Sequence, residues 1–330
     1  MMRFSSRCIL IALLIVLELA CQPREDLSTP SVKVDSSLVT VLSQRKYEVH
    51  QRLTLVNKGP GQPEKQNIWV ALIRDFPPYQ QVMSMEISPA KYELITDEYG
   101  NQYAEFDFSN HPPGVTKTVQ IDYRVTVNEL TYDLSACEGE LVDSFIQPEL
   151  HIESANPQIM SLASELSRDK KTVCQQVRAF YDYIGDKLVY TYNGKNWGAQ
   201  AALGDMGADC TEYTSLLVAL SRSQRIPARY FEGLLFLDSE TKTKAQLEHA
   251  WADVDMPGVG WVAVDPTLGR ALSDRDTYFA HHTPEHIIIT LGSNPSTLRG
   301  GSYWTHLYWP GDSTKIRVEA GEWKISLIEN

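Results

Sequence analysis

The sequence predicts two domains of different fold class, an antiparallel β-sandwich followed by an α+β domain. Three observations predict this. With 330 residues, the chain has room for two domains that each bury a core. Apolar residues recur with a period of two from about residue 32 to residue 128, without a helical stretch. Near residue 150 the pattern changes to helical periodicity, and strand-like runs follow it.

The β-sandwich is predicted over residues 32–135. Apolar and polar residues alternate in the runs Tyr47–Leu55 and Val119–Val127. Glycine- and proline-rich turns such as Lys58-Gly59-Pro60-Gly61 separate such runs, and short strands at this spacing are typical of a sandwich. No acid, base or nucleophile clusters in this half, so we expect a spacer or a binding module.

The α+β domain is predicted over residues 136–330. Apolar faces indicate helices at Ile159–Leu166 and Val173–Leu188, and a third helix that begins at Cys210. Residues 197–207 are rich in glycine and alanine and are expected to form a loop. Strands are expected at 228–237, 248–255, 260–265, 285–291 and 314–328.

The N-terminus has the features of an export signal. Arg3 and Arg7 precede the apolar run Cys8–Leu17, which is shorter than the roughly 20 residues that span a bilayer. Positive charge, a short apolar core and then small residues indicate a secretory signal over residues 1–20.

The end of this signal predicts a membrane anchor. Ala20-Cys21 resembles the bacterial lipobox, although Glu18 stands where that motif usually has leucine. We therefore expect a lipid on Cys21 and a polar tether over residues 21–31. The protein would then be an exported, membrane-anchored lipoprotein on the periplasmic or cell-surface side. An ordinary cleaved signal or an uncleaved N-terminal segment is the alternative.

Charge and composition exclude some partners. The net charge of −12 and the lack of clustered lysine and arginine argue against nucleic acid. The run His281-His282-Thr283-Pro284-Glu285-His286 superficially resembles a metal cluster. Its proline and the absence of helical i, i+4 spacing argue against that, and we expect a solvated loop leading into a strand. We expect neither a metal nor a cofactor.

Export changes how the five cysteines are interpreted. Cys8 leaves with the signal and Cys21 carries the lipid, which leaves Cys137, Cys174 and Cys210. An odd number in an exported chain indicates one free thiol, for which Cys210 is the candidate. The other two either form a disulfide or are two buried small apolar residues, and the sequence does not decide between these.

Cys210 stands where a reactive thiol is favoured. It lies in Gly207-Ala208-Asp209-Cys210-Thr211-Glu212-Tyr213, a small turn that leads into the third predicted helix. Unpaired N–H groups and the positive end of the helix dipole favour a thiolate at a helix start. The N–H group of Cys210 is also free to donate to an oxyanion. Asp209 and Glu212 are expected to interact with the same helix terminus.

His249 and Asp265 are expected to face each other across a hairpin. His249 follows Cys210 by 39 residues, and Asp265 follows His249 by 16. A hairpin centred near Pro257 pairs them directly, because they stand eight positions before and after it, with β-carbons roughly 4.5–5.5 Å apart. The carboxylate would then orient the imidazole, and the imidazole would take the thiol proton. The opposite face would be wholly apolar, which supports this register: Ala250, Ala252, Val254, Val262 and Val264.

Four segments resemble the signature blocks of the bacterial transglutaminase-like superfamily, and the resemblance covers roughly residues 155 to 292. It implies a papain-like fold, in which a helix bearing cysteine packs against a sheet bearing histidine and aspartate. It implies that Cys210 is the nucleophile, His249 the general base and then acid, and Asp265 the orienting carboxylate. The blocks are Asp209-Cys210-Thr211-Glu212, Ile226-Pro227-Ala228-Arg229, His249-Ala250-Trp251 and Gly260-Trp261-Val262-Ala263-Val264-Asp265-Pro266-Thr267.

The resemblance also bears on the cleft. Animal transglutaminases use an indole to help to stabilise the oxyanion, and Trp197 and Trp251 are the candidates here. No acidic cluster resembles the calcium sites of those enzymes. Trp251 and Trp261 either line the cleft or belong to the core. Four polar residues before the nucleophile either border the cleft or pack within their loop: Tyr190, Tyr192, Asn196 and Gln200.

Superfamily members include cross-linking transglutaminases, and many bacterial relatives look like proteases or amidases. We therefore expect a cysteine-dependent amide or peptide hydrolase, or an acyl transferase, that acts on protein or peptide substrates of the cell envelope. Hydrolysis is favoured because water is abundant. The alternative is a non-catalytic envelope scaffold that retains the fold for binding.

Overall fold

The structure is a computed structural model that describes residues 38–64, 66–192, 197–204, 207–237, 245–293, 306–310 and 316–328. The predicted signal over residues 1–20, the lipidation site Cys21 and the tether 21–31 lie outside the described residues. Among the described residues, no helix has the length and apolar character that crossing a membrane requires.

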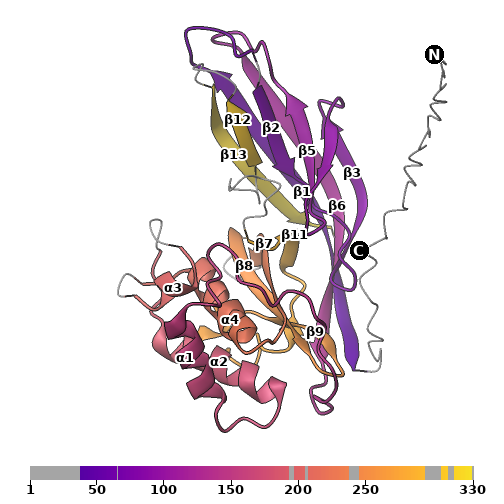
Figure 1. Cartoon of the computed structure of the whole chain (residues 1–330). Coiled ribbons are helices and arrows are strands. Elements are labelled where there is room, and N and C mark those ends of the chain that lie inside the picture. Colours follow the sequence, from indigo (N-terminus) through magenta and orange to yellow (C-terminus); the bar gives the residue numbers. More distant parts are fainter. Residues whose placement is uncertain are drawn as a thin grey trace, which may run out of the picture. The chain divides into compact units, whose positions relative to one another are not determined.

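Two antiparallel sheets form the predicted β-sandwich (Figure 1). One sheet has the order β10-β6-β1-β13, with β3 also paired to β6, and the other has the order β12-β2-β5-β4. The strands are β1 (Val39–Asn57), β2 (Gln66–Ala71), β3 (Gln80–Ser88), β4 (Glu93–Thr96), β5 (Gln102–Asp107), β6 (Thr116–Tyr132), β10 (His281–His282), β12 (His306–Pro310) and β13 (Ile316–Leu327).

Alternation in the sequence corresponds to the faces of these strands. Tyr47, Val49, Leu53 and Leu55 in β1 are at most 2% exposed and belong to one apolar core with residues of β6. Charged residues between them, such as Arg52, are exposed. The period of two therefore predicted which side of each strand is buried.

The C-terminal strands complete the sandwich. β13 pairs with β1, and β12 pairs with β2. This differs from the predicted domain limits of 32–135 and 136–330, because β12 and β13 belong to the sheets of the first domain. Alternation shows that a segment is a strand and which face is buried, but it does not identify the neighbouring strand.

Helices and a four-stranded antiparallel sheet, order β11-β7-β8-β9, form the α+β part, and the helices lie together at one side of the sheet (Figure 1). The predicted strands and long helices are confirmed, while the predicted loop over 197–207 contains the short helix α3. The elements are α1 (Pro157–Ser167), α2 (Val173–Lys187), α3 (Ala199–Ala202), α4 (Cys210–Ser223), β7 (Ala228–Leu237), β8 (Ala245–Met256), β9 (Gly260–Val264) and β11 (His286–Leu291).

A capping box fixes the start of α4. The side chain of Asp209 accepts a hydrogen bond from the Thr211 N–H (3.0 Å), and the side chain of Glu212 accepts one from the Asp209 N–H (2.9 Å). These contacts satisfy N–H groups that a helix start leaves unpaired. The helix is buried along most of its length and ends just before Ile226-Pro227, where proline prevents its continuation. Cys210 is thereby held at the first helical position.

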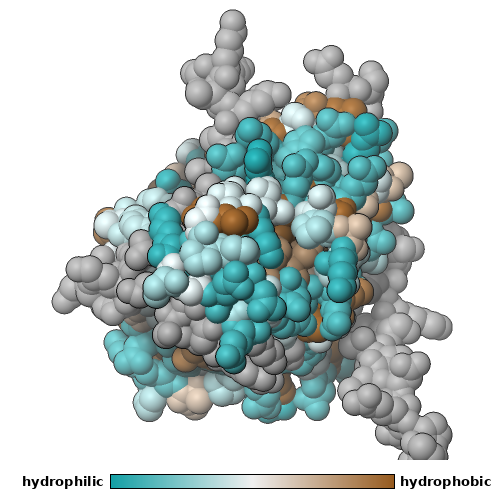
Figure 2. Space-filling model, turned by 90° about the horizontal axis from the view of Figure 1, so that it is seen from above, coloured by the Kyte–Doolittle hydropathy of each residue, from teal (hydrophilic) through white to brown (hydrophobic). Residues whose placement is uncertain are grey.

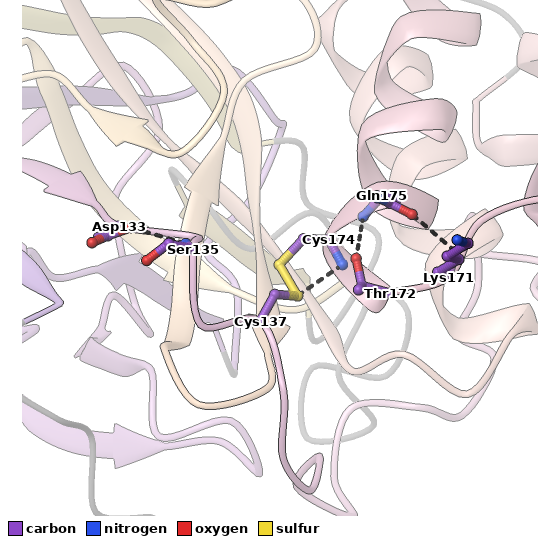
Figure 3. The surroundings of a disulfide bond; sticks show 7 residues. All are labelled: Asp133, Ser135, Cys137, Lys171, Thr172, Cys174 and Gln175. Carbon is purple, nitrogen blue, oxygen red and sulfur yellow. Dashed lines mark hydrogen bonds between the residues drawn. A yellow bond between two sulfur atoms is a disulfide. The ribbon is translucent and has the colours of Figure 1, made fainter.

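Cys137 and Cys174 form a disulfide that joins the segment after β6 to the start of α2 (Figure 3). The N–H group of Cys174 also contacts the sulfur of Cys137 at 3.0 Å, and Thr172 caps α2 by accepting from the Gln175 N–H at 3.2 Å. Of the alternatives that the sequence left open, the structure contains the bonded one. Cys210 is the free cysteine among the described residues.

Neutral side-chain amides join the sandwich to β11, an edge strand of the core sheet. Gln80 donates to the carbonyl of Ile288 (2.9 Å) and accepts from its N–H (2.8 Å). Asn101 forms the same pair of bonds with Leu291, at 2.7 and 2.8 Å. The free edge of the core sheet is thus satisfied by the other half of the chain.

On the face drawn in Figure 2, hydrophilic residues predominate and hydrophobic residues are scattered in small groups.

Candidate active site

The proposed nucleophile lies at the N-terminal end of α4. Cys210 is the first residue of this helix and is partly exposed. Its backbone N–H belongs to the first turn, where no intrahelical acceptor is available. The helix start therefore supplies a hydrogen-bond donor and a favourable field for negative charge beside the sulfur.

His249 connects Cys210 to Asp265. Nε2 of His249 lies 2.7 Å from Oδ2 of Asp265, and the Cys210 side chain is near enough to the imidazole to act on its pKa. Because Nε2 faces the carboxylate, Nδ1 is the ring nitrogen that remains for the thiol. The histidine and the aspartate are only 7% and 3% exposed. The structure therefore brings the three predicted residues together in the predicted order.

The hairpin that carries His249 and Asp265 has a register two residues away from the predicted one. Ala252 pairs with Val264, and the turn centres on Gly258 rather than on Pro257. The N–H of Val259 donates to the carbonyl of Met256 (2.9 Å), and Gly258 has a φ of 78°, which a glycine adopts without strain.

This register corrects the predicted contact. His249 and Asp265 do not lie directly opposite each other, because β9 ends at Val264 and position 265 falls beside Trp251. A shift of two residues preserves the alternation of faces, whereas a shift of one would reverse it. The two side chains therefore stay on one face and meet along a diagonal.

Four hydrogen bonds hold the Asp265 carboxylate. Its Oδ1 accepts from the backbone N–H groups of Thr267 and Leu268, both at 2.9 Å. Its Oδ2 contacts Nε2 of His249 and, at 3.1 Å, Nε2 of His286. A carboxylate that accepts on both oxygens is fixed in orientation and stabilised as the anion.

The two groups of this pair have opposite pKa shifts. Burial acts to lower the pKa of His249, but the Asp265 carboxylate and the Cys210 side chain outweigh it and raise the pKa to about 10. Burial acts to raise the pKa of Asp265, but His249 and His286 hold it well below its usual range. A positive imidazole beside an ionised carboxylate is the state that this geometry favours.

The sequence did not identify His286. It was expected in a solvated loop, but His282 and His286 are only 1% and 2% exposed, so that expectation is wrong. The segment is buried because β10 pairs with β6 and β11 pairs with β7. One signal was available in the sequence. His286 stands at the start of a predicted strand, two positions before Ile288, and side chains two positions apart in a strand point to the same face.

His249, Asp265 and His286 also have the composition of a metal site. Their ligand atoms lie within 4.8 Å of one another. A tetrahedral ion with bonds of 2.0–2.2 Å separates its ligand atoms by about 3.3 Å. The separations of 2.7 and 3.1 Å on Asp265 are those of direct hydrogen bonds instead. The geometry is that of a hydrogen-bonded group.

The two tryptophans proposed to assist the oxyanion occupy different environments. Trp251 is 1% exposed and packs against Phe231 and His286, so it belongs to the core. Trp197 is 55% exposed, and its ring lies 6.0 Å from that of His151. Trp261, the other strand indole, lies under the guanidinium of Arg229 at 3.9 Å.

Tyr190 borders the nucleophile. Its backbone forms a bridge with Ala208, two residues before Cys210. Burial and the nearby side chains of Cys210 and Asp209 raise the pKa of Tyr190, whose ring lies under the guanidinium of Arg270 at 4.8 Å. Of the other residues considered for the cleft, Tyr192 and Gln200 are exposed, and Asn196 lies outside the described residues.

Residues 160–266 match the transglutaminase-like superfamily, and this part of the chain is a transglutaminase-like domain. Cys210, His249 and Asp265 all lie inside the match. The "Uncharacterized protein YebA" of Bacillus subtilis (strain 168) is 26% identical over 173 residues, which cover 45% of this chain and 23% of the relative. The chain thus spans about a quarter of that relative's length.

A similar fold occurs in a crystal structure described as a "putative cysteine protease" from Cytophaga hutchinsonii. That chain is 16% identical to this one, with a TM-score of 0.65, and the similarity covers 89% of this chain and 94% of the other. It extends over the β-sheets at the N-terminus as well as over the helices and core sheet. At this identity the similarity establishes the fold.

Proposed function

We propose that the protein is an exported, lipid-anchored cysteine enzyme that hydrolyses amide or peptide bonds, or transfers their acyl group, in protein or peptide substrates of the cell envelope. One observation carries the proposal: His249 lies between Cys210, at the start of α4, and Asp265, to which it is hydrogen bonded. A thiol, a base and an orienting acid in this order are the requirements of thiol acyl transfer.

In the first half of the reaction, the proton of Cys210 passes to Nδ1 of neutral His249, which gives the positive imidazole that the site favours, and the thiolate attacks the substrate carbonyl carbon. The carbonyl π electrons move to oxygen, and the Cys210 N–H donates to this oxyanion. The imidazolium that forms lies against Asp265, which stabilises its charge. When the intermediate collapses, the C–N bond breaks, His249 protonates the leaving amine, and a thioester remains on Cys210.

In the second half, His249 takes a proton from water, and the resulting oxygen nucleophile attacks the thioester. The C–S bond breaks, the sulfur leaves as the thiolate and is reprotonated by His249, and a carboxylic acid is released. A primary amine in place of water gives a new amide by the same steps. We favour hydrolysis because water is abundant and Cys210 is partly exposed.

Two features support an exported location. The N-terminal sequence has a charged start, a short apolar core and Ala20-Cys21. The disulfide between Cys137 and Cys174 is typical of an oxidising compartment. A Cys21→Ser variant tests the anchor: it should lose metabolic labelling by a fatty acid and leave the membrane fraction. Retention of the label would contradict lipidation at this residue.

The decisive test compares the full chain with its Cys210→Ala variant. At neutral pH, iodoacetamide should label the wild type faster than an ordinary thiol, and Cys210→Ala should lose this fast phase and all turnover. A glutamine peptide offered with and without a fluorescent primary amine separates hydrolysis from transfer. An unreactive Cys210 together with no turnover of peptides would instead favour the non-catalytic scaffold.

A further inference from the structure

His286 is a second histidine on the carboxylate of the candidate triad. It is 2% exposed, and its Nε2 lies 3.1 Å from Oδ2 of Asp265, the same oxygen that contacts His249. Its other ring nitrogen, Nδ1, lies 2.8 Å from the hydroxyl of Thr283. Both nitrogens of this buried imidazole therefore have a defined partner.

These partners determine where the protons lie. An ionised carboxylate only accepts, so His286 must donate to Asp265 from Nε2. In the neutral ring Nδ1 then carries a lone pair, and the Thr283 hydroxyl donates to it. His249 must also donate to Oδ2 from its Nε2, which leaves its Nδ1 able to accept a proton from Cys210. The arrangement thus fixes the tautomer that the proposed reaction requires.

Contacts with the sandwich hold the segment that carries His286. The strand β10 pairs with β6, and the Tyr47 hydroxyl donates to the carbonyl of Pro284 (2.8 Å). Arg45 pairs with Glu285 at 2.8 Å. The ring of His286 also packs edge-on against Trp251, with centroids 4.8 Å apart. The segment and its imidazole are therefore held in place by the sandwich and by Trp251.

We infer that His286 is a positioning residue for the Asp265–His249 pair. The inference rests on the proposed function, because it assigns a role in that reaction. By donating to Oδ2, His286 keeps this oxygen aimed at Nε2 of His249, while Thr267 and Leu268 hold Oδ1. Without the donor, the carboxylate rotates about its bond to Cβ, the imidazolium loses its closest counter-charge, and the thiolate forms less readily. His286 itself exchanges no proton with substrate.

The test uses two variants of similar size in the full chain. Gln in His286→Gln keeps an N–H donor near the position of Nε2, and Met in His286→Met removes it with little change in volume. We expect His286→Met to lower kcat about 10- to 100-fold with little change in KM. His286→Gln should recover most of this loss. Melting temperatures confirm that both variants are folded.

The pH dependence of Cys210 alkylation by iodoacetamide supplies a readout that a packing role would not move. The acid limb should shift to higher pH in His286→Met and stay near the wild-type position in His286→Gln. The ionisable groups around this site are Cys210, His249, Asp265, Tyr181, Tyr190, Asp209, Tyr278 and His282. These groups are the same in both variants. A difference between the two alkylation profiles therefore shows the effect of the hydrogen-bond donor at position 286.

Equal kcat and equal alkylation profiles in Gln and Met variants would overturn the inference. A shift of the acid limb to lower pH in the Met variant would overturn it too, because His286 would then compete with His249 for the carboxylate. Both outcomes leave the proposed function intact if wild-type Cys210 reacts rapidly. A slow wild-type thiol with no turnover would instead refute the proposed function itself.

Discussion

Buried polar side chains serve different ends in the two halves of the chain. Where the sandwich meets the core sheet, the neutral amides of Gln80 and Asn101 bond to the backbone of β11. In the active site, the buried ionisable side chains of His249 and Asp265 bond to each other beside the partly exposed Cys210. A side-chain amide is neutral at every pH, whereas the active-site side chains gain and lose protons. The first arrangement fixes geometry, and the second can also perform chemistry.

The largest effect is expected when the active-site charge is removed without changing its shape. In Asp265→Asn, the amide oxygen can still accept from Thr267 and Leu268, but an amide N–H faces the histidines. His249 must then accept at Nε2, which places its proton on Nδ1, the nitrogen that should receive the thiol proton. We expect kcat to fall about 10³- to 10⁴-fold, measured on peptide turnover per folded molecule.

Asp253→Asn is the matched control for this change. Asp253 is a fully buried carboxylate on the same hairpin, and it accepts from Arg229 and Tyr79 rather than from the triad. If Asp265→Asn and Asp253→Asn lower kcat equally, the distinction between catalytic and structural charge fails.

The pH dependence of stability should follow His249. Its pKa of about 10 in the folded chain lies above the usual 6.5, so its stabilising contribution is complete below about pH 6.5 and disappears as pH rises to 10. Asp265 has a lowered pKa, so its contribution is present above about pH 4 and is lost in acid. Both are complete between about pH 4 and 6.5.

This prediction is measured as the difference in free energy of unfolding between wild type and His249→Gln. We expect a difference on the order of a few kcal/mol near pH 6 that shrinks steadily toward pH 10. A difference that stays constant from pH 6 to 10 would show that His249 is not held as the cation.

A buried ion pair in the core sheet should affect stability alone. Arg229 forms a two-pronged pair with Asp253, whose side chain is fully buried. Removing one partner of such a pair leaves an uncompensated charge and typically costs about 3–5 kcal/mol. Arg229→Met should therefore lower the denaturation midpoint strongly while folded molecules retain the Cys210 alkylation rate. A loss of that rate in folded protein would link this pair to the active site.

The sequence predicted the parts of this fold that depend on local pattern. The helix start at Cys210 followed from its turn and apolar periodicity, and β7 at 228–237 was predicted at its observed limits. The three triad residues were found because each has a reactive side chain inside a recognisable block. These features depend on neighbours within a few positions, which a sequence displays directly.

The features that were missed depend on contacts between distant segments. The hairpin register depends on which residue of Met256–Gly260 centres the turn, and a proline next to a glycine fits two centres. The burial of His286 depends on β10 meeting β6, and the sandwich is closed by β13, some 260 residues after β1. Neither contact leaves a periodic trace in the sequence. The sequence therefore indicates a strand that begins near His286, but not that His286 contacts Asp265.

The smallest effect is expected at the junction of the two halves. Gln80→Met keeps the volume of the side chain but leaves the N–H and the carbonyl of Ile288 unpaired, which costs about 1–3 kcal/mol. Because no ionisable group is involved, the loss should be the same at pH 5 and pH 9, in contrast to His249→Gln. Gln81→Met, at the exposed neighbouring position, is the control and should be near neutral. If the loss of unfolding free energy in Gln80→Met varied with pH, the junction would be coupled to the charges of the active site. The neutral amides would then not act independently of the active-site side chains.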